Sequence, residues 1–237
     1  KRASGVAAAA AAAGLRHHIT PHAVYSVSQQ LLAMLGRHIS PASLTSLHFL
    51  ETDEERDLVS RRRGRLMESY KSLGINAENI NTPADHLQTA IILAKQTGHL
   101  ILVHNTCITE EEVKILADER NVWFCLCPRS NMYISGKVPP ADILRRASDR
   151  IVAGTDSLAS NSQLNLFDEL MLLHDSYPDI PLDEIIRWGT INGARALKME
   201  ENLGTIEPGK RPGLLLIEGV DFARMRLLPG SRMRRLL

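Results

Sequence analysis

The chain has little cysteine, almost no net charge and no long apolar run. Its three cysteines, Cys107, Cys125 and Cys127, are too few for a secreted disulfide framework. Lys and Arg number 28 against 27 Asp and Glu, so no overall field attracts nucleic acid or a membrane surface. No apolar stretch reaches the ~18 residues of a membrane span, and no signal peptide is visible. These absences predict a cytoplasmic protein that binds neither nucleic acid nor membrane.

The two ends of the chain are biased in composition. Seven alanines at 7–13 predict a helix closed by Gly14, unless they stand in for other side chains. We expect that an upstream portion is missing, because the chain opens on Lys1. Near the other end, five arginines follow the last acid, Asp221, and a solvated or subunit-facing terminus fits them better than a phosphate patch. These are Arg224, Arg226, Arg232, Arg234 and Arg235.

The 237 residues, 44% of them apolar, can bury a real core, and the clearest piece of it is the run 100–103. The apolar run fits a strand buried on both faces, and it ends in His104, Asn105 and Thr106. An α/β barrel keeps its chemistry at the carboxyl ends of its strands. His104 is therefore the first candidate for a functional residue.

Two other predicted strands end in the same way. His48 and Glu51 close the strand at 43–49, and Asp156 follows the strand at 150–154. These ends recur at intervals of about fifty residues, which is the rhythm of alternating strands and helices. The pattern predicts one rim of reactive side chains. His22, just beyond a short strand predicted at 17–20, fits a rim residue and a structural histidine equally well.

Helix and turn signals fill the intervals between these strands. Ser28 is expected to cap one helix, Thr82 with Pro83 to open another, and Thr109 with Glu112 to form a capping box. The predicted helices are 29–37, 82–96, 109–120, 141–148, 164–174 and 182–197, with a charged helical segment at 53–74. Further strands are expected at 122–127 and 214–217, the latter in a separate β-rich unit.

Metal-dependent hydrolysis fits the predicted rim. Imidazole and carboxylate are ligands of Zn²⁺ or Fe²⁺, so His48 and Asp156 are candidate metal ligands and Glu51 a candidate proton carrier. Two ligands are one short of the usual minimum for catalytic zinc. Cys125 and Cys127 have Cys-x-Cys spacing, which lacks the pattern of the zinc deaminases of flipped bases, so we interpret them as buried strand residues.

Six motifs then appear in a recognisable order. They are HFLET at 48–52, VHNT at 103–106, CPRSN at 127–131, GTDSLASN at 154–161, TINGARAL at 190–197 and GTIEPGK at 204–210. Together they resemble the amidohydrolase superfamily, most closely its branch of cytosine deaminases, chlorohydrolases and S-adenosylhomocysteine or aminofutalosine deaminases. The resemblance implies a (β/α)8 TIM barrel of the metal-dependent hydrolase type. Residues 1–200 would cover about strands four to eight, and residues 201–237 part of a small β-sandwich and the tail.

Site roles follow from the resemblance. His48 and Asp156 would bind one divalent metal ion, zinc in the first place, with iron as the alternative. Glu51 would shuttle protons, His104 would polarise the group under attack, and Asp156 would also accept the proton of the attacking water. Substrate contacts would come from His22, Arg129 and Asn131.

The resemblance has one departure, because family members carry a His-x-His pair on the first strand and this sequence has none. We interpret the chain as the carboxyl-terminal part of a longer enzyme. The expected reaction is hydrolytic deamination of an aminated purine, pyrimidine or related heterocycle, a small-molecule substrate. Removal of chloride or an amide nitrogen, and a catalytically silent barrel that serves as a binding module, stay open as alternatives. A homodimer also stays open.

Overall fold

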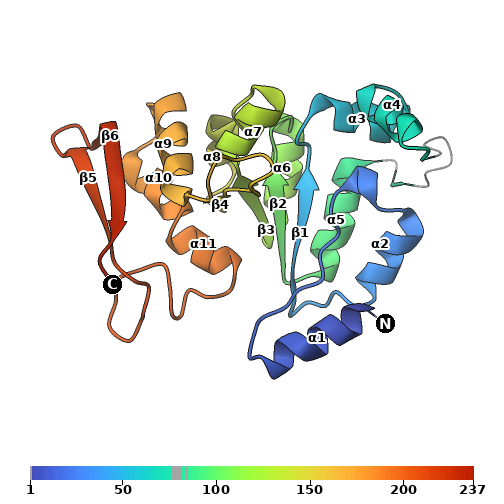
Figure 1. Cartoon of the computed structure of the whole chain (residues 1–237), viewed down its shortest axis with the longest axis horizontal. Helices are drawn as coiled ribbons and strands as arrows, with labels where there is room; N and C mark the ends of the chain where they lie inside the picture. The colour runs from blue at the N-terminus through green and yellow to red at the C-terminus, as the bar shows by residue number, and fades with distance from the viewer. Residues whose placement is uncertain (1, 76–81, 84) are drawn as a thin grey trace.

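A four-stranded parallel sheet forms the centre of the computed structural model, which describes residues 2–75, 82–83 and 85–237 (Figure 1). The strands are β1 (Leu44–Phe49), β2 (His99–His104), β3 (Val122–Leu126) and β4 (Ile151–Ala153), and they lie side by side in sequence order. Parallel neighbours need long crossovers, and helices supply them. The predicted α/β class with a parallel sheet is confirmed.

Helices precede, connect and follow the strands. Before the sheet come α1 (Arg2–Ala12), the 3-10 turn η1 (Val24–Ser26) and α2 (Gln29–Gly36). The crossovers contain α3 (Asp53–Arg61), α4 (Arg65–Ser72), α5 (His86–Gln96), α6 (Glu110–Asp118), α7 (Pro128–Ser135) and α8 (Ala141–Ala147). After β4 come α9 (Leu166–Ser176), α10 (Leu182–Trp188) and α11 (Ile191–Ala196). Within the described residues, no helix is long and apolar enough to cross a membrane.

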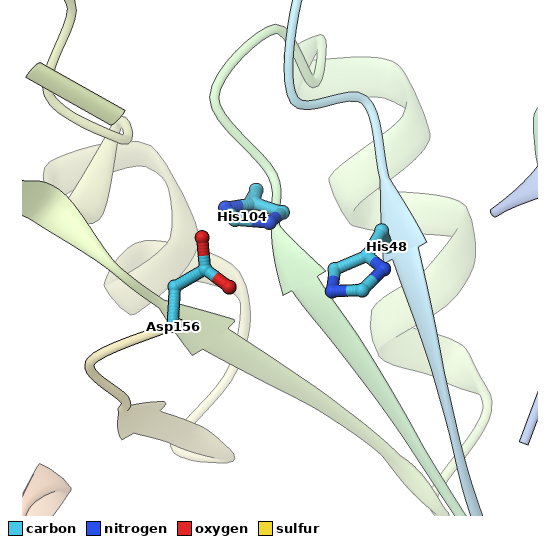
Figure 2. A group of neighbouring side chains, drawn as sticks. All are labelled: His48, His104 and Asp156. Carbon is cyan, nitrogen blue, oxygen red and sulfur yellow. The ribbon is translucent and has the colours of Figure 1, made fainter. Parts of the chain in front are cut away.

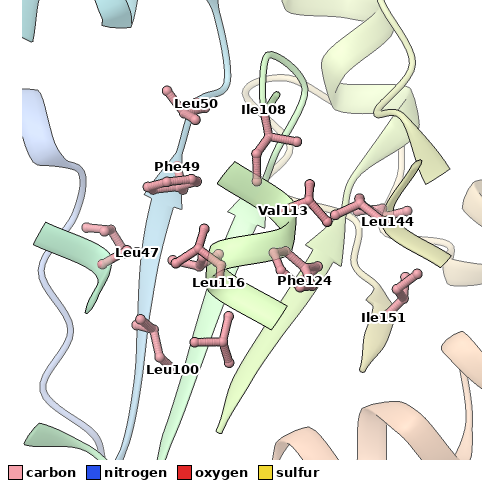
Figure 3. Close-up of a cluster of buried hydrophobic side chains, with 14 of the residues drawn as sticks. Leu47, Phe49, Leu50, Leu100, Ile108, Val113, Leu116, Phe124, Leu144 and Ile151 are labelled. Atoms are coloured by element: carbon pink, nitrogen blue, oxygen red, sulfur yellow. The ribbon is translucent and has the colours of Figure 1, made fainter. Parts of the chain in front are cut away.

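The two faces of the sheet bury different side chains because successive strand residues alternate between faces. Leu100 and Leu102 of β2 belong to the main core against the helices, part of which is shown in Figure 3. Ile101 belongs to a smaller cluster on the opposite face, together with Trp123 and Val152 of the neighbouring strands. The same alternation predicts the face of the sheet on which each residue at the carboxyl ends of the strands should lie.

Two predicted caps are confirmed and one is wrong. The Ser28 side chain accepts from the Leu31 N–H, and Thr109 with Glu112 forms the capping box of α6. Thr82 does not open α5, because its hydroxyl and carbonyl are bonded to the Arg62 guanidinium. Asp85 caps that helix instead by accepting the Gln88 N–H at 2.7 Å.

The helix predicted at 182–197 is wrong as a single element, since it is divided into α10 and α11. Thr190 adopts φ −127° and ψ −99°, which no helix accommodates. Gly189 packs so closely on α9 that a Cβ there would meet Leu170 at 2.9 Å. The helical backbone therefore breaks at Thr190, directly after a glycine that leaves no room for a side chain against α9. The charged segment at 53–74 is likewise two helices, α3 and α4.

The strand predicted at 17–20 is also wrong. That segment is irregular and runs beside β1 with one isolated bridge, between Ala23 and His48. The Thr45 hydroxyl holds it by donating to the Ile19 carbonyl at 2.8 Å. Pro21 has no N–H to give to a ladder, which keeps the segment from pairing continuously.

A two-stranded antiparallel hairpin lies at the carboxyl-terminal side of the molecule, beside α9 (Figure 1). Its strands are β5 (Leu215–Asp221), where a strand is predicted, and β6 (Arg226–Arg235). Leu227 packs with Phe167 of α9 and Leu182 of α10. At the other end of the chain, the alanine run lies in helix α1 and the turn after it. The three cysteines are free, with Cys127 buried and Cys125 only partly so.

Candidate active site

Three strand ends bring His48, His104 and Asp156 together (Figure 2). One potential ligand atom from each lies within 4.8 Å of the other two, and no other such group of three occurs in the described ranges. The His48 and His104 rings stack with their centroids 5.2 Å apart. Residues separated by about fifty positions in sequence thus share one spot at the carboxyl edge of the sheet.

The position of His104 depends on an unusual backbone conformation. By alternation it should share a face with Leu100 and Leu102, against the helices. Instead φ is +80° at His104, and rotation about the N–Cα bond carries Cβ with it. The ring consequently stacks on His48, whose own neighbour Phe49 points into the helix-side core. The left-handed conformation thus turns a core position into a site position.

Other strand ends at this rim share the left-handed conformation. Leu50, Asn105 and Asp156 have φ between +51° and +58°, a region that costs energy for residues other than glycine. Hydrogen bonds between adjacent rim loops hold it in place: the Asn105 N–H donates to the Phe49 carbonyl at 2.9 Å, and the Cys107 N–H to the Leu50 carbonyl at 2.8 Å. The backbone of the rim is therefore strained, and hydrogen bonds from the neighbouring loop hold it in this conformation.

Neighbouring groups leave one free ligand atom on His48 and one on Asp156. His48 Nδ1 lies 2.9 Å from the His22 carbonyl, so this nitrogen carries the proton and Nε2 keeps its lone pair. Both Ser130 and Ser160 donate to Oδ2 of Asp156, the first at 2.7 Å. The Ser157 backbone N–H is a further hydrogen-bond donor to this carboxylate, while no side-chain hydroxyl reaches Oδ1 among the described residues.

Glu51 and His104 face each other beside this pair. Asn131 Nδ2 lies 3.1 Å from His104 Nδ1, and because an amide nitrogen can only donate, Nδ1 accepts and Nε2 carries the proton. His104 Nε2 in turn lies 3.5 Å from Glu51 Oε1. A proton-carrying carboxylate and an N–H donor therefore flank the two groups that have free ligand atoms.

The family sequence model that matches this chain, that of the amidohydrolase family, covers residues 3–229. The chain belongs to the amidohydrolase family. It is 29% identical over 226 residues to a 5-methylthioadenosine/S-adenosylhomocysteine deaminase of Syntrophobacter fumaroxidans, a match that covers 91% of this chain and 46% of that protein. The chain spans about half the length of the curated relatives it matches.

Solved structures of deaminases share its fold. Helicobacter pylori aminofutalosine deaminase in complex with methylthio-coformycin matches with a TM-score of 0.69 at 31% identity, over 84% of this chain and 49% of that one. An adenosine deaminase from Xanthomonas campestris with bound zinc matches with a TM-score of 0.61 at 28% identity, over 86% and 44% of the two chains. The predicted family and its deaminase branch are confirmed.

Burial and neighbouring groups set the charge states of the rim side chains. Burial, reinforced by the Glu55 and Asp156 carboxylates, raises the pKa of Glu51 to about 7. Burial also lowers the pKa of His104 to about 4, with His48 as the second cause. Burial would raise the pKa of Asp156, but the Ser160 and Ser130 hydroxyls outweigh it and hold that pKa below its usual value. At neutral pH the rim thus offers a neutral imidazole, an ionised aspartate and a half-protonated glutamate.

The three predicted substrate residues lie in different surroundings. His22 is exposed, and its ring centroid is 4.7 Å from that of His48. Asn131 is buried against His104. The Arg129 guanidinium is turned toward Ser162, at 2.8 Å, and Asp168, and so lies outside the three-residue group.

Sequence reasoning missed two residues of this site, Ser130 and Ser160. Both stand inside motifs that were recognised, next to Asn131 and after Asp156. Ser130 is carried by α7, whose first residue is Pro128, a good helix-starting position that the sequence analysis did not use. That proline was the available signal for Ser130, while nothing local singles out Ser160.

Proposed function

We propose that the protein to which this chain belongs is a metal-dependent deaminase of an aminated purine, most closely of the adenosine type. The observation that carries the proposal is the arrangement of Glu51 and His104 beside His48 and Asp156, with a carboxyl group whose pKa is about 7. A general acid and base works best with a pKa near the working pH. The names of three curated relatives, a 5-methylthioadenosine/S-adenosylhomocysteine deaminase, an adenosine deaminase and a 5'-deoxyadenosine deaminase, support the substrate class.

The donor set of the rim fits a divalent metal ion. His48 is oriented by a backbone carbonyl on its far nitrogen, as metal-binding histidines usually are, and Asp156 by two hydroxyls. Imidazole nitrogen and carboxylate oxygen suit zinc, with iron second. His48 and Asp156 would hold the ion, which when bound lowers the pKa of a coordinated water. Three or more ligands are usual, so further ligands would have to join these two.

The side chains of the rim would divide the proton transfers between them. Asp156 takes a proton from the water that adds to the amino-bearing ring carbon. Glu51 gives its proton to the adjacent ring nitrogen, then takes the remaining proton of the added hydroxyl and delivers it to the amino group, which leaves as ammonia as the carbon–nitrogen bond breaks and the carbonyl forms. The proton held by Asp156 then restores the protonated form of Glu51. His104 donates its Nε2–H to the oxygen that develops negative charge, since its low pKa keeps the ring neutral and its Nδ1 bonded to Asn131.

Substrate binding is proposed for the outer part of the same rim. His22 is exposed beside His48, and the buried Asn131 keeps its Oδ1 without a hydrogen-bond partner among the described residues. Arg129 would contribute only if its present ion pair with Asp168 opened. These three assignments stay predictions.

The finer architecture is part of the proposal too. The four parallel strands would be strands five to eight of a (β/α)8 barrel, with 17–23 in the place of strand four. Residues 201–237, with the β5–β6 hairpin, would belong to a small β-sandwich. The cytoplasmic location and the homodimer also stay predictions.

The test is an ammonia-release assay with full-length protein and with adenosine, 5-methylthioadenosine and S-adenosylhomocysteine as substrates. The protein is stripped of metal, reloaded with zinc or iron and assayed each time. We expect turnover that follows metal content. Release of chloride from chlorinated analogues without ammonia would favour the alternative reaction, and binding without turnover in the metal-loaded protein would favour a binding module.

A further inference from the structure

A buried carboxylate lies directly beneath the proposed proton carrier. Glu55, in the first turn of α3, is 1% exposed. Its Oε2 accepts the backbone N–H of Glu51 at 2.9 Å, and its Oε1 lies 3.0 Å from Nε2 of His86, itself buried at the start of α5. Three elements, the end of β1, α3 and α5, therefore meet at one carboxylate.

Burying a carboxylate is costly unless its oxygens are matched by donors. An apolar side chain at this buried position would avoid that cost. The carboxylate instead serves a backbone N–H in the segment between β1 and α3, which no helix or sheet ladder supplies with a partner. The position of the Glu55 carboxylate indicates that it holds the backbone at Glu51 in one conformation.

The segment that carries Glu51 is held at both sides. Leu50 has φ +51°, and its carbonyl accepts the Cys107 N–H, while the Glu55 N–H donates to the Thr52 carbonyl at 3.2 Å. Between these anchors the Glu55 carboxylate fixes the peptide from which the Glu51 side chain reaches to within 3.5 Å of His104. A shift of this peptide would move the Glu51 carboxylate directly.

We propose that Glu55, which lies beside His86, is a positioning residue that sets the Glu51 carboxylate against His104. This inference rests on the proposed function, because it assigns Glu55 a task in the same reaction. Displacement of a catalytic group by about 1 Å can cost on the order of 100-fold in rate, and loss of an outer hydrogen-bond partner typically 10–100-fold.

The experiment compares Glu55→Ala, Glu55→Gln and Glu112→Ala in the metal-loaded full-length protein. We expect Glu55→Ala to lower kcat by roughly 10–100-fold, with KM changed less than about threefold and metal content retained. Glu55→Gln should recover most of the rate, since its amide oxygen can accept the Glu51 N–H as the Glu55 carboxylate does. Glu112 is the matched control: its carboxylate is bonded to Arg56 and to the Thr109 N–H and has no contact with Glu51. Its loss should affect stability rather than kcat.

A second measurement does not depend on activity. Hydrogen exchange at the Glu51 amide should accelerate in Glu55→Ala and stay slow in Glu55→Gln, with the thermal unfolding midpoint recorded for each variant. Unchanged kcat in folded Glu55→Ala, while Glu51→Gln is inactive, would overturn the positioning role and leave the proposed function intact. A wild-type protein without deaminase activity would refute the proposed function, and the Glu51 exchange rate would then still decide whether Glu55 orders this peptide.

Discussion

The two ends of β2 use the same kind of residue differently. His99 begins the strand, and its Nδ1 lies 2.9 Å from the Ala196 carbonyl, while Asn121 nearby donates to the Ala94 and Thr97 carbonyls. At this end, polar side chains saturate backbone groups and join neighbouring elements. His104 ends the strand and faces other side chains, Asn131 and Glu51. One end of the sheet secures the fold, and the other keeps reactive atoms available.

Backbone strain follows the same division. Four of the seven non-glycine residues with positive φ in the described part of the chain lie at the carboxyl rim: Leu50, His104, Asn105 and Asp156. The buried side-chain oxygens of Asn105, Thr106 and Asn131 also lack a hydrogen-bond partner there. Strain and unmatched polar atoms are tolerated where they orient functional groups, and they cost stability. The comparison predicts that rim substitutions change activity while substitutions at the amino ends change stability.

The largest effect is expected for Glu51→Gln. The amide keeps the shape of the side chain but cannot carry protons, so kcat should fall by about 10²–10⁴-fold while bound metal stays near the wild-type level. Kinetics and metal analysis of the same full-length preparation check this. Parallel loss of metal and activity would mean that Glu51 binds the ion rather than carries protons.

His48→Ala and His99→Ala test the two ends of the sheet directly. His48→Ala should lose most of its bound metal with little change in the free energy of unfolding, because the side chain lies at the rim. His99→Ala should keep metal and activity but lose about 1–2 kcal/mol of stability with its hydrogen bond to Ala196. Urea unfolding and metal analysis distinguish these results. Loss of stability in His48→Ala with loss of metal in His99→Ala would contradict the proposed difference between the two ends of the sheet.

The raised pKa of Glu51 has a consequence for the stability of metal-free protein. Between its ordinary pKa near 4.5 and its folded value of about 7, the folded state binds more protons than the unfolded state. The contribution of Glu51 to the free energy of unfolding is therefore fully present below pH 4.5 and is lost as the pH rises through 7. The loss is at most about 3 kcal/mol. The free energy of unfolding of Glu51→Gln, measured by urea unfolding, should therefore increase relative to that of the wild type as the pH rises from 5 to 8. An unchanged difference between the two proteins would show that burial does not perturb this carboxyl group.

The smallest effect is expected for Ser160→Ala. Removal of one of two hydroxyls on Asp156 Oδ2 should cost roughly 1–2 kcal/mol of the stabilisation of that carboxylate, which corresponds to about 10-fold in metal affinity. Ser157→Ala is the matched control, since the Ser157 hydroxyl is exposed and bonds only locally, to the Ala159 N–H. Metal titration of both variants measures the difference. Equal affinities would indicate that the Ser130 hydroxyl and the Ser157 backbone N–H suffice to orient Asp156.

The sequence by itself determined the local features. Apolar runs ending in polar residues located β1, β2 and β4 and placed His48, His104 and Asp156 at their carboxyl ends, because such runs report burial over a few neighbouring residues. Caps at Ser28 and Thr109 followed from side chains that bond within three residues.

Only the tertiary structure decided what depends on distant packing. The left-handed backbone at His104 reverses the face that alternation assigns to it, and the Phe49 carbonyl, 56 positions before Asn105, helps to hold that backbone. The break between α10 and α11 falls at Thr190, directly after Gly189, which packs closely on Leu170 of α9. Ser130 reaches Asp156 across 26 positions, and Glu55 meets His86 from a separate helix. Periodicity and spacing carry no information about such contacts, since each is selected by the free energy of the whole packed arrangement rather than by its own segment.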